Sequence, residues 1–190
     1  MGLHPNSDQS DIEQTIQTIQ SKADIIDGIG EIGLDERNDT VNRNFELQLE
    51  IAERLKKPVN VHSRGKTEKV IETLGSYQLN GVMLHWFSGN DAELAKACDR
   101  GYLIGFGPAS VYSKKLQKLI AKCPLQNLMT ESDAPVRYSA CFEEMETDPR
   151  FVASVIFSLS IHKKLDAEDM EKAIERNFRN YIGLKLRIHQ

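Results

Sequence analysis

Long apolar runs are missing from this sequence of 190 residues. A helix that crosses a bilayer needs about 20 consecutive apolar residues, so a membrane-spanning protein is not expected. The first ten residues carry neither a basic stretch nor an apolar one, so a secretory signal is not expected either. The chain is therefore expected to be cytoplasmic and to have no membrane partner.

Cysteines are few, and the chain has no excess of positive charge. Cys98, Cys123 and Cys141 are odd in number and lack the spacing of metal-binding cysteines, which predicts reduced thiols in a cytosolic protein. Lys and Arg total 24 against 28 Asp and Glu, giving a net charge of −4. That charge excludes a generally basic protein that coats DNA, and it leaves room for a local phosphate site.

What the sequence does contain is an alternation of short apolar runs with helical patterns. Low-complexity tracts, internal repeats and linkers are missing, so residues 1–190 are predicted to form a single domain. Apolar periodicity predicts strands at 1–4, 25–32, 59–62, 82–85, 102–106 and 128–131. It predicts helices at 11–22, 40–57, 66–74, 91–100, 113–122, from 148 onward and at 166–181.

The predicted strands are apolar throughout, with little alternation of polar residues. This pattern indicates a parallel sheet covered by helices, in an α/β fold. The first of the six predicted strands, at 1–4, is only a stub. A doubly wound sheet can use six strands, whereas a closed (β/α)₈ barrel needs eight strands and typically about 250 residues. Strand number alone leaves both architectures open.

Polar residues gather where the predicted strands end. The fifth strand ends in glycines, and the other strand ends carry His4, Glu31, His62, His85 and the pair Glu131 and Asp133. Carboxyl ends of parallel strands converge on one face, where α/β proteins bind their ligands. Two imidazoles and two carboxylates from Glu31, His62, His85 and Asp133 make a mixed nitrogen and oxygen set suited to zinc, manganese or magnesium.

Each of these residues also has an ordinary structural interpretation. His4 alone is typical of a hydrogen-bonded structural histidine, Glu31 of a loop carboxylate, and Asp133 of a cap on the following turn. Four such residues together at strand ends favour a metal site over coincidence.

One glycine-rich segment formally matches a dinucleotide fingerprint. Residues 28–33 read G-x-G-x-x-G, but that fingerprint requires a helix to begin inside the motif and to point at the pyrophosphate. Here the next helix is predicted to begin only at Thr40. The carboxylates of Glu31 and Asp35 would also lie where phosphate charges belong, so dinucleotide binding is rejected.

Several segments together resemble the signatures of the TatD family of metal-dependent hydrolases. They are GLHP (2–5), GIGEIGLD (28–35), VNVHSRG (59–65), LHWFSG (84–89), MTESDAP (129–135) and NFRNYIGL (177–184). The resemblance covers essentially the whole chain in the right order. It implies a (β/α)₈ TIM barrel of the metal-dependent hydrolase type and a phosphodiesterase that uses metal-activated water, usually a deoxyribonuclease acting from DNA ends.

The resemblance also implies roles for individual residues. Glu31 is similar to the carboxylate that contacts both metals, and His62 and His85 are similar to the histidines of the second metal. Asp133 is similar to the aspartate that binds the first metal and handles the nucleophilic water. Glu31 and Asp133 are thus the predicted catalytic residues, and all four are predicted metal ligands.

One family signature has no counterpart here. The family's first strand carries an H-x-H pair for the first metal, and this sequence contains no H-x-H. If Met1–Pro5 ends the third strand, the barrel is N-terminally incomplete, with about six of eight βα units. A shortened or wrongly started sequence and a natural fragment both explain this. One divalent ion (Mg, Mn or Zn) is then expected in place of two, with weak or no activity unless a homo-oligomer covers the open barrel.

Two further residues are predicted to bind substrate. Arg64 follows His62 closely enough to hold a phosphate, although a solvated loop charge is an equal alternative. His4 is expected at the mouth of the site. The predicted partner is DNA or another phosphodiester. The alternatives are a hydrolase of small esters or amides and a non-catalytic remnant that binds metal, since ligands at strand ends fix the metal and leave the substrate open.

Overall fold

The computed structural model describes residues 1–35, 39–143 and 145–183, and the chain forms two compact units. Of the described residues, the first unit contains those in 1–84 and 179–183, and the second contains those in 85–178. The single domain expected over residues 1–190 stays a prediction. Leu184, the last residue of the C-terminal motif quoted above, lies outside the described residues.

The first unit alternates helices with parallel strands. A 3-10 turn at Gln9–Asp11 precedes α1 (Ile12–Ser21), β1 (Ile29–Gly33), α2 (Asp39–Leu55), β2 (Val59–His62), α3 (Thr67–Leu74) and β3 (Val82–His85), whose last residue opens the second unit. In the parallel pair, Ile29 of β1 lies opposite Val59 of β2, and Gly33 opposite His62. Both strands therefore present their carboxyl ends at the same edge.

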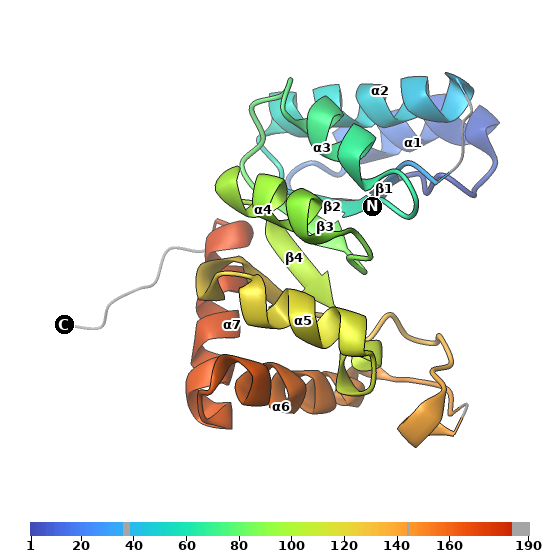
Figure 1. The fold of residues 1–190 in the computed structure, drawn as a ribbon. Coiled ribbons are helices and arrows are strands. Elements are labelled where there is room, and N and C mark those ends of the chain that lie inside the picture. The colour runs from blue at the N-terminus through green and yellow to red at the C-terminus, as the bar shows by residue number, and fades with distance from the viewer. Residues whose placement is uncertain (36–38, 144, 184–190) are drawn as a thin grey trace. The chain divides into compact units, whose positions relative to one another are not determined.

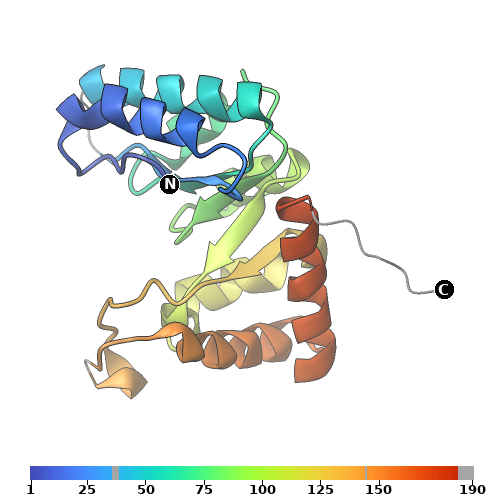
Figure 2. The same ribbon diagram turned by 180° about the vertical axis from the view of Figure 1, so that it is seen from behind.

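Helices cover these strands because their apolar residues recur on one face. In α2, Val41, Phe45, Leu49 and Ala52 are buried and are spaced three or four residues apart. Figures 1 and 2 show α1 and α2 side by side on the same side of β1 and β2. The strands are buried as well, with Ile32 and Val61 fully buried.

The second unit repeats the alternation. Its main elements are α4 (Asp91–Asp99), β4 (Leu103–Phe106), α5 (Lys114–Lys122), β5 (Leu128–Thr130), α6 (Val152–Lys163) and most of α7 (Ala167–Tyr181). β4 and β5 pair in parallel, with Phe106 opposite Thr130. Short 3-10 turns at Pro108–Val111, Leu125–Asn127, Ala140–Phe142 and Pro149–Phe151 connect them.

The predicted stub strand at residues 1–4 is wrong, and the described residues form five strands instead of six. The backbone of this segment bonds to a side chain in place of a ladder. Gln48 of α2 accepts the Leu3 N–H at 2.6 Å and donates to the Leu3 carbonyl at 3.2 Å. Met1 still accepts the Gly30 N–H at 3.1 Å, so the segment runs beside β1.

The helix predicted from Asp148 begins as a 3-10 turn, and the α-helix itself starts at Val152. Asp148 caps the 3-10 turn, since its carboxylate accepts the Arg150 N–H at 2.8 Å. Across the described part of the chain, every helix is too short or too polar to cross a bilayer.

Candidate metal-binding site

In the first unit, glycines bring β1 against β2 at the strand ends. Gly33 has a φ of +144°, and a Cβ at this position would lie 2.0 Å from the His62 carbonyl oxygen. Only glycine allows this approach, which directs the chain toward Asp35. The strand continues through the G-x-G-x-x-G segment and α2 begins at Asp39, in agreement with the rejection of dinucleotide binding.

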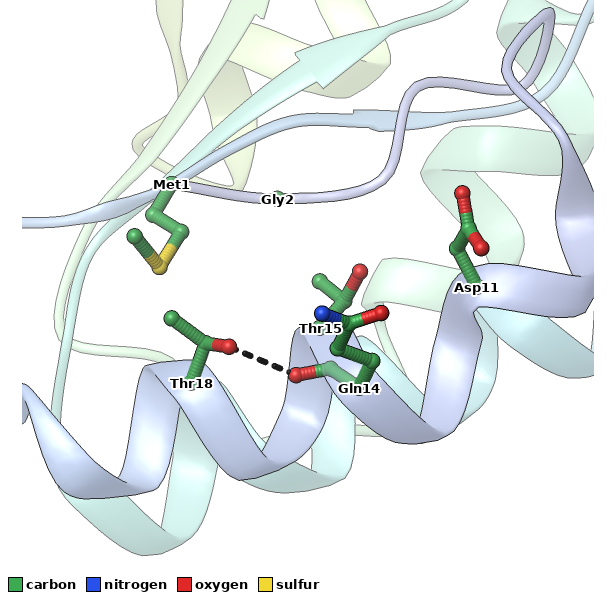
Figure 3. Close-up of a pocket in the computed structure, with 6 residues that line it drawn as sticks. All are labelled: Met1, Gly2, Asp11, Gln14, Thr15 and Thr18. Carbon is green, nitrogen blue, oxygen red and sulfur yellow. Dashed lines mark hydrogen bonds between the residues drawn. The ribbon is translucent and has the colours of Figure 1, made fainter.

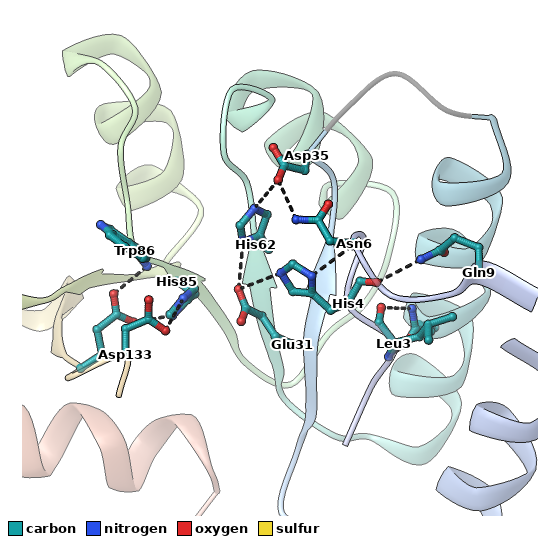
Figure 4. Close-up of polar contacts among 12 residues, drawn as sticks. Leu3, His4, Asn6, Gln9, Glu31, Asp35, His62, His85, Trp86 and Asp133 are labelled. Carbon is teal, nitrogen blue, oxygen red and sulfur yellow. Dashed lines mark hydrogen bonds and ion pairs between the residues drawn. The ribbon is translucent and has the colours of Figure 1, made fainter. Parts of the chain in front are cut away.

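His62 lies between two carboxylates of the first unit (Figure 4). Its Nδ1 is 3.0 Å from Oε1 of Glu31, and its Nε2 is 3.5 Å from Oδ2 of Asp35. Among the described residues, this buried Nε2 has no hydrogen-bond partner. Asn6 fixes the aspartate by donating its Nδ2 to Asp35 Oδ2 at 3.1 Å.

His4 is close to the same glutamate. Its Nε2 is 3.8 Å from Glu31 Oε1, and its ring centroid is 4.7 Å from that of His62. His4, Glu31 and His62 can each offer a ligand atom within 4.8 Å of the others. The Asn6 N–H, however, donates to His4 Nδ1 at 3.1 Å. A neutral ring that accepts at Nδ1 carries its proton on Nε2, so His4 faces Glu31 with a hydrogen-bond donor.

The second unit holds a matching arrangement around His85, the last residue of β3. His85 Nδ1 is 2.7 Å from Oε2 of Glu131, and His85 Nε2 is 3.4 Å from Oδ1 of Asp133. The Trp86 N–H donates to the other glutamate oxygen, Oε1, at 2.7 Å. The side chains of His85 and Glu131 are only 8% and 10% exposed, so the contact is shielded from water.

Two non-glycine residues beside His85 have left-handed backbone conformations. Trp86 has a φ of +41° and Asp133 a φ of +50°. Such conformations cost about 1–3 kcal/mol each and persist where the surrounding structure imposes them. The bond from Trp86 N–H to Glu131 holds the first of them, which makes this cluster a functional candidate on geometric grounds.

Tyr138 packs against the second cluster. Its hydroxyl donates to the Ser132 carbonyl at 3.4 Å, and its ring centroid is 5.8 Å from that of Trp86. Burial, followed by the charges of Asp133 and Glu131, raises the pKa of Tyr138 above its ordinary value. The phenol therefore stays neutral and donates in this cluster.

The donor atoms of both clusters fit a divalent cation. A neutral imidazole that donates Nδ1–H to a glutamate has its lone pair on Nε2. In both units this Nε2 faces an aspartate oxygen, at 3.5 Å from His62 to Asp35 and 3.4 Å from His85 to Asp133. Two electron-rich atoms are unfavourable neighbours unless a cation or a proton lies between them. Two ligands about 2.1 Å from a tetrahedral zinc ion lie about 3.4 Å apart, so both pairs match.

The structure thus brings the predicted site residues together in two groups. Glu31 contacts His62 in the first unit, and His85 contacts Asp133 in the second. A joint site of all four residues stays a prediction. Arg64 is exposed two positions after His62, and its role in phosphate binding stays a prediction too.

Three contact residues were not among the predicted site residues. Asp35 belongs to the same motif as Glu31, and Glu131 forms a strand-end pair with Asp133, so both carried a sequence signal. Asn6 carried none, because its contacts to His4 and Asp35 depend on how residues 1–6 fold over β1.

A separate cavity of about 320 Å³ lies in the first unit (Figure 3). It is lined by Met1, Gly2, Asp11, Gln14, Thr15 and Thr18. None of the predicted ligands or substrate contacts lines it. The predicted site residues therefore lie apart from this cavity.

Comparison with known proteins decides the family. A family model described as TatD related DNase matches residues 1–183. The chain belongs to the TatD family. An uncharacterized metal-dependent hydrolase, MJ1582 of Methanocaldococcus jannaschii, is 31% identical over 98% of this chain and 76% of that protein. The 3'-5' ssDNA/RNA exonuclease TatD of Yersinia pseudotuberculosis is 32% identical over 96% of this chain and 76% of that protein.

A solved TatD homologue supports the fold. The crystal structure of YJJV from Escherichia coli has a TM-score of 0.86 and 28% identity, covering 97% of this chain and 76% of that one. The α/β fold of the TatD barrel class, predicted from the motifs, is confirmed. The chain is a TatD-type metal-dependent hydrolase.

Proposed function

We propose that the chain hydrolyses phosphodiesters in DNA, acting at strand ends with a divalent cation. The buried Nε2 of His62 carries the proposal, because it faces Asp35 while Nδ1 is held by Glu31. The exonuclease name of a TatD relative supports DNA as the substrate class. The net charge of −4 favours contact with a few phosphates over a long basic groove.

The proposed ligands of Mg, Mn or Zn are Glu31, His62, His85 and Asp133, the set that the resemblance implies. At His62 the carboxylate that faces the assigned Nε2 is that of Asp35, and Glu31 lies on the Nδ1 side. Each of these cations would neutralise charge on phosphoryl oxygens and lower the pKa of a bound water, to about 7 in the case of zinc. The two histidines are assigned Nε2 as the binding atom, because each Nδ1 is held by a glutamate. The Asp133 carboxylate accepts the proton of the attacking water, with Oδ1 remaining toward His85.

Substrate contacts are assigned to His4 and Arg64. The Nε2–H of His4 points toward Glu31, where it can donate to a phosphate oxygen beside the predicted ligands. The guanidinium of Arg64 can bind a second phosphate with two parallel hydrogen bonds. Both residues then position the DNA strand, and neither binds the cation.

The test is cleavage of end-labelled single-stranded DNA in Mn²⁺ or Mg²⁺, comparing the unmodified chain with His62→Ala. A ladder of shortened products that disappears in EDTA and in the variant supports the proposal. His162→Ala is the matched control, because His162 lies in α6 outside both clusters, and this variant should cleave normally.

Two results overturn the proposal. One is cleavage that persists in EDTA or in His62→Ala, which would place the activity elsewhere or in a contaminant. The other is cation binding without cleavage of DNA. Turnover of bis(p-nitrophenyl) phosphate or of a small carboxylic ester then separates a different hydrolase from a non-catalytic protein.

A further inference from the structure

Glu131 holds two neighbouring groups at once. One carboxylate oxygen is 2.7 Å from His85 Nδ1, and the other accepts the Trp86 N–H at 2.7 Å. Both oxygens are thereby directed at the chain segment that ends β3. The glutamate side chain is 10% exposed, so water competes weakly for these contacts.

These contacts set the protonation pattern of His85. A carboxylate only accepts hydrogen bonds, so the Nδ1 atom facing it must carry a proton. In the neutral ring the lone pair is then on Nε2, which lies 3.4 Å from Asp133 Oδ1. Metal-binding histidines commonly donate their other ring N–H to a carboxylate, which fixes the tautomer and the ring orientation.

We propose that Glu131 is a positioning residue that keeps the proton of His85 on Nδ1 and so directs Nε2 to the divalent cation. The inference rests on the proposed function for the cation and adds a residue that binds neither cation nor substrate. Glu131 differs in this from Glu31, whose contact with His62 is made by a predicted ligand.

Glu131 also joins the ring to the backbone that carries it. Trp86 follows His85 directly and has a φ of +41°, a conformation that a tryptophan adopts only under constraint. Because the Trp86 N–H and the His85 ring bond to one carboxylate, the turn and the imidazole are fixed together. Replacement of Glu131 should therefore change both the tautomer and the ring position.

The first test needs neither substrate nor a variant of Glu131. The full chain, labelled with ¹⁵N-histidine and free of metal, is examined by NMR at pH 8, and His85→Gln assigns the His85 signals. The expected spectrum shows a neutral ring protonated on Nδ1. A ring protonated on Nε2, or an imidazolium bound to both carboxylates, would overturn the inference.

The second test compares Glu131→Gln with the unmodified chain for Zn²⁺ affinity by calorimetry. Glutamine can still accept from Trp86, but its amide donates to Nδ1 and moves the ring proton to Nε2. Loss of such an orienting carboxylate typically weakens metal binding about 10- to 100-fold. The matched control is Glu146→Gln, an exposed glutamate paired with Arg137 in the same unit, which should bind Zn²⁺ normally.

Zn²⁺ affinity of Glu131→Gln within twofold of the unmodified chain, with an unchanged His85 tautomer, would contradict the inference. Failure of the chain to cleave DNA would not contradict the inference, because both measurements are made without substrate. The tautomer shift in Glu131→Gln separates positioning from a purely structural role, since thermal destabilisation alone leaves the proton on Nδ1.

Discussion

His62 Nε2 and Asp35 Oδ2 face each other at 3.5 Å, and this nitrogen has no hydrogen-bond partner among the described residues. The opposite ring atom, Nδ1, is held by a glutamate at 3.0 Å. The second unit repeats the order of glutamate, histidine and aspartate around His85. A histidine between two carboxylates is stable when a cation or a second proton occupies the Nε2 side, so a divalent cation would satisfy both clusters.

His4→Gln tests whether this residue contacts substrate or metal. Because the Asn6 N–H bonds to Nδ1, His4 presents a donor and should not bind the cation. A hydrogen bond to a charged group contributes about 1.5–3 kcal/mol. The variant should therefore lose about 10- to 100-fold in kcat/KM for an oligonucleotide and keep its metal affinity. Metal affinity that falls as far as in His62→Ala would instead make His4 a ligand.

Asn177→Ala tests how α7 supports the strand that leads to Glu131 and Asp133. The Asn177 side chain is buried and donates to the carbonyls of Leu125 and Leu128 at 2.9 and 2.8 Å. A buried carbonyl left without its donor costs about 1–3 kcal/mol. Urea unfolding should show a loss of about 2–4 kcal/mol. Asn180→Ala, an exposed position of the same helix, should cost much less, and equal losses would contradict the assignment.

The secondary structure could be predicted from the sequence where periodicity and strand burial agree. From 59 to 122, each predicted helix and strand lies within one residue of the observed element. The prediction of a strand at residues 1–4 was wrong because Gln48, 45 positions away from Leu3, bonds to the backbone groups of Leu3 that a β-ladder would use. Local pattern carries no information on such a distant side chain.

Contacts within the candidate site could be predicted in part, and whether its residues form one metal site stays a prediction. Strand-end position singled out Glu31, His62, His85 and Asp133, and the structure gives each histidine a carboxylate neighbour. The protonation pattern of the rings could not be predicted, because it depends on the N–H of Asn6 and on the oxygens of Glu131. Those contacts arise from tertiary packing.

Tyr138→Phe tests the burial of the second cluster through its pH dependence. The raised pKa means that the folded chain holds the phenol proton more tightly than the unfolded chain. This contribution to stability is complete below the unfolded pKa of about 10 and is lost as the pH rises above it. Tyr138→Phe should therefore lose less stability than the unmodified chain between about pH 10 and 12. Parallel losses in both would show that Tyr138 titrates normally.

The three thiols should react in a fixed order. Cys141 is exposed, Cys98 is half-buried and Cys123 is buried. The hydrogen bond between the two thiols lowers the pKa of Cys98, and that same bond together with burial raises the pKa of Cys123. A disulfide reagent at pH 8 should modify Cys141 first, then Cys98, and Cys123 only after unfolding. Early modification of Cys123, located by mass spectrometry, would contradict this packing.

The most direct test of the central claim is calorimetric titration of the metal-free chain with Mn²⁺ and Zn²⁺, alongside His62→Ala and His85→Ala. We expect saturable binding by the unmodified chain and, in each variant, a loss of at least tenfold in affinity at the position of the replaced histidine, because the Nε2 atom of each histidine is proposed as a ligand. Failure of the chain to bind either ion, or binding that both variants retain, would contradict the claim that these histidines form a metal site.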